Sequence, residues 1–216
     1  MMSDDFPRPE AALLARAAKL PSATIHEAMG RKGALPAIIK PVAAGMMICG
    51  PAATVVAKPF NNINIHRAIY LAKPGDVLVV DVGGGYEAGY FGEIMAHACQ
   101  ARKLGGLVID GCVRDADLLQ EIGFPVFARG LAIQGTTKDE GGSVFEPIKI
   151  GAVDIAPGDV IVGDRDGVVA VPLGQLKEAL DASEAREEKE AGVIEQLKAG
   201  ASTIGLYGWS PRPGGK

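Results

Sequence analysis

Apolar positions follow two different periods along the chain. Near the start, apolar residues recur at helical spacing in segments 9–20 and 21–30. In the second segment, Ser22 or Thr24 is a candidate N-cap and Gly30 a candidate stop. From residue 45 onward the apolar runs are short, rich in valine and isoleucine, and bounded by glycine and proline, which is typical of strands. We expect strands in six such runs: 45–58, 76–82, 105–111, 124–130, 160–164 and 167–172.

Helical patterns separate these strands at 62–72, 91–105 and 115–123. Alternation of strand and helix indicates a layered α/β domain. Continuous apolar strands such as "VLVV" at 77–80 indicate burial on both faces. The turn Pro-Gly-Asp precedes two strands, at 74–76 and 157–159, so either a turn motif is used twice or a half-domain is duplicated.

The last third of the chain contains a long, highly charged helical pattern at 174–200. Its apolar residues form only a thin stripe, made of Leu176, Leu180, Val193 and Leu197. Such a helix usually has one solvated face and one docked seam, although the run "AREEKE" is also what a fully solvated face looks like. We therefore expect one α/β domain over 1–216, with an N-terminal helical segment at 1–35 and a tail at 208–216.

Composition excludes several classes of function. A net charge of −4 and an aromatic content of 5% provide neither a basic surface nor stacking platforms, so nucleic acid is not an expected partner. There is no uninterrupted apolar run of membrane-spanning length, and the start carries acids and prolines instead of a signal peptide, so we expect a cytoplasmic protein without membrane contact. The three cysteines lie far apart, which predicts buried, reduced thiols.

The segment 81–115 combines features of a ligand site. A strand ends at Asp81, three glycines follow, and a helix begins near Glu93. The first amides of that helix, from Glu93 to Met95, have no partner inside it and favour an anion. The glycine spacing fits neither a Walker loop nor G-x-G-x-x-G, so a carboxylate is as good a guest as a phosphate.

A second strand in this segment leads to "IDGCVRD" at 109–115, which places Arg114 beside Asp115. If this strand is parallel to the first, both carboxyl ends reach one edge of the sheet, where ligands of open α/β folds bind. Arginine presents a planar fork to a carboxylate or an oxyanion, and aspartate is a hard ligand for Mg²⁺ or Mn²⁺. Together they would polarise a 2-oxo acid, although the pair alone is also compatible with a surface salt bridge.

From "SATIHEAMGRKG" to "GLYG" the chain resembles the class II pyruvate aldolases that cleave 4-hydroxy-4-methyl-2-oxoglutarate and 4-carboxy-4-hydroxy-2-oxoadipate. These aldolases share their fold with the regulator of ribonuclease activity A. The motif of that family is an acid, twenty residues and Arg-Asp, which here reads Glu93, twenty residues and Arg114-Asp115. The blocks "GYFGEIMA", "IDGCVRD", "PGDVIV" and "DRDGVVAVP" resemble family blocks in the same order. The resemblance implies a β/β/α sandwich of the swivelling-domain type.

The resemblance also implies the roles of the site residues. Asp115 would bind a divalent metal, Mg²⁺ or Mn²⁺, directly, and Arg114 would bind the 2-oxo group and stabilise the enolate. A glutamate from the C-terminal helix of a neighbouring subunit, best matched by Glu190 and less well by Glu187 or Glu188, would act through water, as would Glu93. The remaining substrate-binding residues would be Gly92, Glu93, Ile94 and Met95 around the pyruvyl carboxylate, and His66, which an Asn-x-x-x-His pattern points to. The site would then exist only in a homo-oligomer, a trimer or a hexamer.

The implied reaction is a retro-aldol cleavage of a 4-hydroxy-2-oxo di- or tricarboxylic acid to pyruvate and a second 2-oxo acid. A base near Glu93 takes the proton of the 4-hydroxyl, the C3–C4 bond breaks, and the metal neutralises the pyruvate enolate as a Lewis acid. Decarboxylation of oxaloacetate passes through the same enolate and is the expected side activity. The aldolases usually have aspartate where this chain has Glu93, and the sequence specifies neither the C4 substituent nor the choice between Mg²⁺ and Mn²⁺.

The sequence is also compatible with other interpretations. A non-catalytic protein of the ribonuclease-regulator type has the same fold, but the full-length C-terminal helix with Glu190 argues against it. A demethylmenaquinone methyltransferase finds no support, because no S-adenosylmethionine loop of the Rossmann type is visible. His66 is equally compatible with a structural role, His26 and His97 favour one, and Asp110 ends a buried strand where it could support the site by a hydrogen bond.

Overall fold

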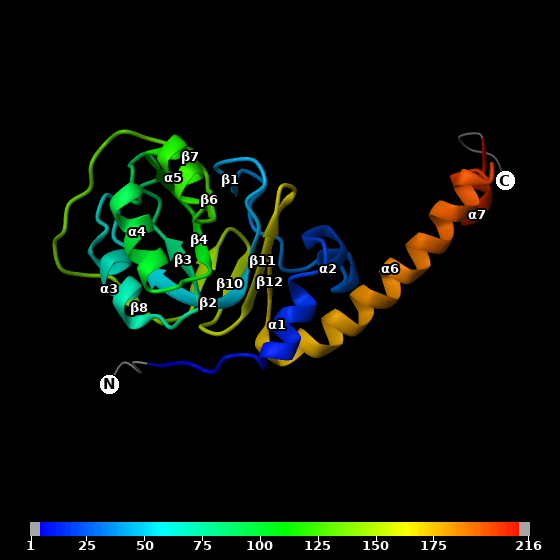
Figure 1. Cartoon of the computed structure of the whole chain (residues 1–216), viewed down its shortest axis with the longest axis horizontal. Coiled ribbons are helices and arrows are strands. Elements are labelled where there is room, and N and C mark those ends of the chain that lie inside the picture. Colours follow the sequence, from blue (N-terminus) through cyan, green and yellow to red (C-terminus); the bar gives the residue numbers. More distant parts are fainter. Residues whose placement is uncertain (1–4, 212–216) are drawn as a thin grey trace.

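The computed structural model describes residues 5–211 and places two short helices before the sheet, as the sequence predicts (Figure 1). They are α1 (Ala11–Ala17) and α2 (Ser22–Ala28). Neither Ser22 nor Thr24 caps α2, so that prediction is wrong: Ser22 donates to Asp164 through its amide and its hydroxyl, and Pro21 is the N-cap residue. Gly30, with φ +68°, follows the end of α2 as expected of a stop residue.

The main sheet is mixed and has eight strands. Seven follow the spatial order β1-β6-β4-β3-β2-β11-β12, and β8 pairs with β2 outside this path. Neighbours from β2 to β6 run parallel, whereas β11, β12 and β1 join antiparallel. β1 also contacts β12, so the sheet is nearly closed on itself. The mixed α/β class is confirmed, and the layered sandwich stays a prediction. The bounds are β1 (Lys40–Pro41), β2 (Ile48–Val56), β3 (Val77–Asp81), β4 (Gly106–Ile109), β6 (Val126–Ala128), β8 (Ser143–Val144), β11 (Val160–Asp164) and β12 (Gly167–Val171).

Two short ribbons accompany the main sheet. β5 (Cys112–Val113) pairs in parallel with β7 (Gly130–Leu131), and β9 (Ile148–Ile150) pairs antiparallel with β10 (Val153–Ile155). With two or three residues each, these strands are too short to show a period in the sequence. The pair β5–β7 matters for function because it sets the chain direction just before Arg114.

Strand β3 is buried on both faces, as its continuous apolar sequence predicts. Leu78 and Val80 pack into one apolar cluster with residues of α3 (Ile63–Leu71), α4 (Glu93–Ala101) and α5 (Ala116–Ile122). Val77 and Val79 pack on the other side, into a second cluster with residues of β9, β10 and β11. The helices therefore cover one face of the parallel strands, and the curved sheet encloses the other.

The two Pro-Gly-Asp segments form the same local turn. Asp76 accepts a hydrogen bond from the amide of Lys73, and Asp159 accepts one from the amide of Ala156. The strands that follow differ, because β3 lies parallel to β2 and β11 antiparallel to it. We conclude that a turn motif is used twice and that no half-domain is repeated.

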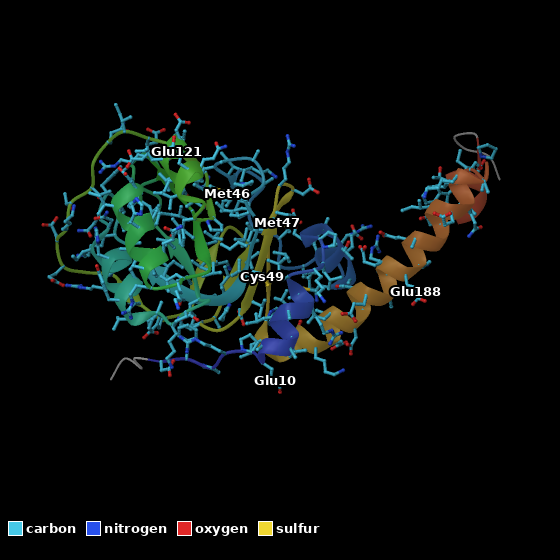
Figure 2. All side chains as sticks on the ribbon, in the orientation of Figure 1. Glu10, Met46, Met47, Cys49, Glu121 and Glu188 are labelled. Carbon is cyan, nitrogen blue, oxygen red and sulfur yellow. The ribbon has the colours of Figure 1, made fainter. Side chains whose placement is uncertain are left out.

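The C-terminal helix α6 (Leu176–Lys198) is attached to the body only along its first half. Leu176, Ala179 and Leu180 are buried in a third apolar cluster with α1, α2, β11 and β12. Beyond Ser183 the helix extends away from the body and carries α7 (Thr203–Tyr207) at its far end (Figure 1). Figure 2 labels Glu188 on this projecting part, and Val193 and Leu197 of the apolar stripe are only partly covered. Residues 1–4 of the N-terminal segment and 212–216 of the predicted tail lie outside the described residues.

The sequence also led to expectations about membrane-spanning segments and about the cysteines. Between residues 5 and 211, no helix is long and apolar enough to cross a membrane. The three cysteines are free, as predicted, but the prediction of burial holds only for Cys99, because Cys49 and Cys112 are half-buried. Burial raises the pKa of the Cys99 thiol to about 12 and that of Cys49 to about 11, so both stay protonated at neutral pH.

Candidate active site

The unit β3–α4–β4 has the geometry that the sequence predicts. β3 and β4 pair in parallel, so the loop after β3 and the segment after β4 meet at one edge of the sheet. Two buried side chains hold the loop: the Tyr90 hydroxyl donates to the carbonyl of Gly85 at 2.6 Å, and Asn62 Nδ2 donates to the carbonyl of Tyr90 at 2.9 Å. These bonds help to position the start of α4 in front of Arg114 and Asp115.

Gly92 precedes α4 because there is no room for a side chain at this position. A Cβ atom on Gly92 would lie 2.3 Å from Asp115 Oδ2 and 3.1 Å from Arg114 Cγ. The next residue, Glu93, donates its amide to the same Oδ2 at 3.1 Å. Asp115 therefore occupies the first anion position at the N-terminus of α4, which the helix dipole favours.

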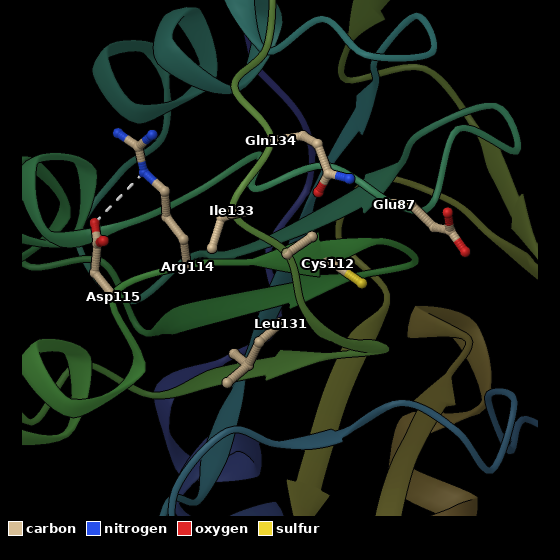
Figure 3. A pocket seen from close by; sticks show the side chains of 8 residues that line it. Glu87, Cys112, Arg114, Asp115, Leu131, Ile133 and Gln134 are labelled. Atoms are coloured by element: carbon tan, nitrogen blue, oxygen red, sulfur yellow. Dashed lines mark ion pairs between the residues drawn. The ribbon is translucent and has the colours of Figure 1, made fainter.

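Arg114 and Asp115 lie side by side at the entrance to α5. The Arg114 amide donates to the carbonyl of Phe91, and Asp115 adopts a left-handed conformation with φ +61° as the residue before α5. Arg114 Nε lies 3.6 Å from Asp115 Oδ2, an ion pair drawn as a dashed line in Figure 3. Their side chains are 49% and 33% exposed, so both remain accessible to a ligand. Asp115 Oδ1 has no hydrogen-bond partner in the described part of the chain.

A cavity of about 390 Å³ brings most of the predicted site residues together. Its wall includes seven of them: His66, Gly92, Glu93, Ile94, Met95, Arg114 and Asp115. The three predicted anion-binding amides are in different situations. That of Glu93 binds Asp115, that of Met95 binds the carbonyl of Gly92, and that of Ile94 has no partner among the described residues. Of these three amides, that of Ile94 is the one left to bind an anion.

A second and larger cavity, of about 810 Å³, adjoins the first through Arg114 and Asp115 (Figure 3). Its wall includes Leu131 and Ile133, which are 60% and 91% exposed, together with Glu87. Besides the shared Arg114 and Asp115, the polar side chains of this wall are those of Glu87 and Gln134. The smaller cavity is the better candidate for the reacting centre, because it contains Glu93 and the start of α4.

His66 lies half-buried in the smaller cavity, near Lys138. Burial lowers the pKa of the His66 imidazole, and the positive charge of Lys138 lowers it further. His66 is therefore neutral at pH 7, and it can offer a hydrogen bond but no charge.

Glu190 lies apart from this cavity in its own chain. It is on the projecting part of α6, where it pairs with Arg186 at 2.8 Å. Of the alternatives, Glu187 accepts a hydrogen bond from Thr24 at 2.6 Å, and Glu188 is exposed. The assignment of Glu190 to a neighbouring subunit stays a prediction.

The other residues singled out from the sequence have local roles. His26 Nδ1 lies 2.9 Å from the carbonyl of Lys32, and His97 lies one helical turn after Glu93, with 4.0 Å between Nε2 and Oε1. Asp110 binds Arg129 at 2.7 Å, with a side chain only 7% exposed. Arg129 also stacks on Tyr86, so this pair supports the loop beside the larger cavity.

The residues present fit a divalent metal bound by few protein ligands. Within residues 5–211, no three His, Cys, Asp or Glu side chains are grouped as a metal site, which excludes a cage made of the described residues. Asp115 offers an unpartnered carboxylate oxygen, and Glu93 offers a second carboxylate in the same cavity. Mg²⁺ typically keeps several waters and binds through one or two carboxylates plus substrate, which matches this donor set.

Asn62 and Lys138 are among the residues of the cavity wall that were not predicted as site residues. Asn62 Oδ1 is buried without a hydrogen-bond partner among the described residues, while its Nδ2 donates to the carbonyl of Tyr90. Lys138 enters from the loop between β7 and β8, far from the motif in sequence. The Asn-x-x-x-His pattern contained a signal for Asn62, whereas nothing near Lys138 in the sequence distinguishes it from a surface lysine.

Most of the chain is similar to known proteins. The family model described as RraA-like: Aldolase/RraA matches residues 22–170. A protein of Halalkalibacterium halodurans named putative 4-hydroxy-4-methyl-2-oxoglutarate aldolase is 33% identical over 83% of this chain and 88% of its own. An uncharacterized protein from Pseudomonas syringae has a similar structure, with a TM-score of 0.83, 29% identity and coverage of 92% and 93%. The Streptomyces coelicolor RraAS2 structure, described as an unusual member of the RNase ES inhibitor RraA protein family, gives 0.78 and 26%, with coverage of 88% and 99%.

Proposed function

This chain belongs to the RraA-like aldolase family, and on that premise we propose that it is a divalent-metal-dependent lyase. The proposed substrate is a 4-hydroxy-2-oxo di- or tricarboxylic acid, cleaved to pyruvate and a second 2-oxo acid. One observation carries the proposal: Arg114, Asp115 and the free Ile94 amide line one cavity together with a second carboxylate, Glu93. The guanidinium and the amide can hold negative charge, and the carboxylates can bind a divalent metal or accept a proton, as a reaction through an enolate needs.

Each of these groups has a distinct task in the reaction. The Ile94 amide receives the pyruvyl carboxylate at the positive end of α4. Arg114 donates to the 2-oxo oxygen and holds the negative charge that develops on it as the C3–C4 bond breaks. Glu93, 44% exposed and thus accessible to water, accepts the proton of the 4-hydroxyl directly or through one water.

The metal would be held by Asp115 directly and by Glu93 through water. When bound, Mg²⁺ or Mn²⁺ supplies Lewis-acid stabilisation of negative charge. Asp115 can serve this role because its Oδ1 is unpartnered and its Oδ2 is positioned by the Glu93 amide. Gly92 is necessary for the same reason, since it leaves the space that the carboxylate occupies.

We propose that the active unit is a homo-oligomer, a trimer or a hexamer, in which Glu190 of one chain acts at the site of the next. The outer half of α6 supports this idea, because it extends beyond the body with Val193 and Leu197 only partly covered. Complementation tests it: mixed oligomers of inactive Glu190→Ala and inactive Arg114→Ala chains should regain activity, since some sites then combine two intact residues. If mixtures of the two variants recover no activity at any ratio, the site is not shared between chains.

Decarboxylation of oxaloacetate is the proposed side activity, because loss of CO₂ from C3 leaves the same enolate. The test uses purified chain with Mg²⁺ and either oxaloacetate or 4-hydroxy-4-methyl-2-oxoglutarate, with pyruvate followed through lactate dehydrogenase. We expect pyruvate from both, and loss of at least about 100-fold in rate with Asp115→Ala, as expected when a group in direct contact with the reacting centre is removed. No pyruvate, or pyruvate formation unaffected by Asp115→Ala, would remove the proposal.

A binding function of the ribonuclease-regulator type is the second candidate. It is favoured by the similarity to RraAS2, which covers nearly all of that structure. Capture of ribonuclease E by the purified chain, combined with absence of lyase activity, would support this function in place of the first.

A further inference from the structure

Arg129 joins the two chain segments that form the candidate site, although it is not part of either cavity wall. Its Nε binds Asp110 Oδ1 at 2.7 Å, and its guanidinium lies 3.9 Å from the centroid of the Tyr86 ring. Asp110 begins the segment that leads to Arg114, and Tyr86 lies in the loop that leads to α4. The walls of the two cavities include neither Arg129 nor its two partners. One side chain therefore connects both segments from outside the cavities.

The same two segments are paired through their backbones. The Cys112 amide donates to the carbonyl of Tyr86 at 3.0 Å, and the Cys112 carbonyl accepts from the Tyr90 amide at 3.1 Å. Further along, the Arg114 amide donates to the carbonyl of Phe91 at 2.9 Å. The position of Arg114 relative to the start of α4 therefore depends on how these segments lie against each other.

Arg129 is itself fixed to the sheet. It lies between β6 and β7, and its amide donates to the carbonyl of Gly111 at 2.9 Å. Its partner Asp110 continues β4 by one residue, because the Asp110 amide donates to the carbonyl of Val80 at 2.9 Å. Burial of a carboxylate has a desolvation cost that an ion pair offsets only in part, so such a pair is weak evidence for stability. A planar guanidinium is well suited to positioning, since it can bind a carboxylate at its edge and stack on a ring with its face.

We infer that Arg129 is a positioning residue: through Asp110 and Tyr86 it holds Arg114 and the Ile94 amide at the spacing that one substrate requires. The inference rests on the proposed function, in which these two groups bind the 2-oxo oxygen and the carboxylate of the same molecule. Without the contact both groups remain present but are misaligned. Misalignment lowers the rate at the reacting centre more than it weakens binding.

A second arginine of the same kind lies at the opposite edge of the sheet and provides a matched control. Arg8 binds Asp76 at 2.7 Å, and its guanidinium lies 3.9 Å from the centroid of the Phe6 ring. Asp76 is buried and immediately precedes β3, whereas the candidate site lies at the carboxyl end of that strand. The side chains of Arg8 and Arg129 are both 20% exposed. Arg8 also pairs with Asp5, so its substitution should cost at least as much stability.

The test compares Arg129→Lys with Arg8→Lys in oxaloacetate decarboxylation, thermal unfolding and hydrogen exchange. Lysine keeps a positive charge for the aspartate but has no planar guanidinium to stack on the ring. We expect Arg129→Lys to lower kcat about 10-fold with KM changed less than about 3-fold, because a misplacement of a full 1 Å costs about 100-fold. Arg8→Lys should leave kcat and KM unchanged while Tm falls at least as much. The amides of residues 82–92 should exchange faster in Arg129→Lys only.

Substitutions of Tyr86 test the stacking contact separately. Tyr86→Phe keeps the ring beside Arg129 and should retain kcat, whereas Tyr86→Leu removes the ring and should reproduce the loss seen in Arg129→Lys. The double variant of Arg129→Lys and Tyr86→Leu should be no slower than Arg129→Lys alone, because both changes remove the same contact. Independent losses that multiply in the double variant would contradict a shared role.

The outcomes separate this inference from the proposed function. An unchanged kcat in Arg129→Lys, or an equal loss in Arg8→Lys, overturns the positioning role even if the lyase reaction is confirmed. If the unmodified chain forms no pyruvate, hydrogen exchange still decides whether Arg129 holds the loop. Faster exchange of residues 82–92 confined to Arg129→Lys supports that role, and unchanged exchange overturns it.

Discussion

Gly92→Ala is the substitution that tests the site geometry most sharply. The added methyl group would lie 2.3 Å from Asp115 Oδ2, and the neighbouring Arg114 Cγ would be at 3.1 Å. The backbone of Gly92 is extended, with φ −163°, so alanine meets no conformational barrier there. The whole effect must therefore come from displacement of the Asp115 carboxylate.

Displacement of the Asp115 carboxylate should affect the rate far more than the stability. Contacts to a Cβ atom are essentially never shorter than 3.0 Å, so Oδ2 must retreat from 2.3 Å to at least that distance. The hydrogen bond from the Glu93 amide, at 3.1 Å, is then broken. A misplacement on the order of 1 Å costs about 100-fold in rate. Loss of one partly exposed hydrogen bond costs only about 1 kcal/mol of stability.

The assay follows pyruvate formation from oxaloacetate and thermal unfolding in parallel. We expect kcat/KM to fall about 100-fold in Gly92→Ala, while Tm falls by only about 2–4 °C for a chain of this size. Gly174→Ala is the control, because a Cβ there has no neighbour within 4 Å. Activity close to that of the unmodified chain would refute the reasoning, as would a Tm loss large enough to show that Gly92 serves the fold alone.

Three further predictions concern other parts of the molecule. Arg129→Met should lower the free energy of unfolding by about 3 kcal/mol in urea titrations, because it leaves the 7%-exposed carboxylate of Asp110 without its partner; a loss below about 1 kcal/mol would contradict this. Lys138→Met should raise the pKa of His66 in an NMR titration, because a positive charge that disfavours the imidazolium is removed, yet burial, the larger cause, should keep it below the ordinary value. Gly192→Ala should stabilise α6 by about 1 kcal/mol in thermal melts followed by circular dichroism, since a Cβ meets nothing within 4 Å, and a lower melting temperature would count against an unobstructed helix at that position.

The regular elements of the fold could be predicted because their sequences carry a clear period. β3 reads as a continuous apolar run and is buried on both faces by two different clusters. The cap of α2 could not be predicted, because the partner of Ser22 is Asp164, which is brought close only by the fold. Strands of two residues such as β5 escape detection for a similar reason, since their pairing is decided by tertiary contacts.

The candidate site also contains residues that the local sequence predicts and residues that only the fold brings together. The glycine-rich loop, the start of α4 and Arg114-Asp115 belong to one strand–helix–strand unit, so local sequence and the right topology suffice to bring them together. Lys138 comes from a loop whose position depends on a side-chain clamp by Asn61, and no local pattern encodes that contact. Which amides at the start of α4 are left to bind an anion also depends on the fold, because the Glu93 amide donates to Asp115.

We propose that Asp115 anchors a divalent ion beside Arg114 and the start of α4, where the enolate of pyruvate is stabilised. Titration of Mn²⁺ into the chain, followed by electron paramagnetic resonance with and without the enolate analogue oxalate, tests it directly. We expect one Mn²⁺ bound per chain, tighter in the presence of oxalate, and no such binding with Asp115→Asn. Equal Mn²⁺ binding by Asp115→Asn, or binding that oxalate does not strengthen, would contradict it.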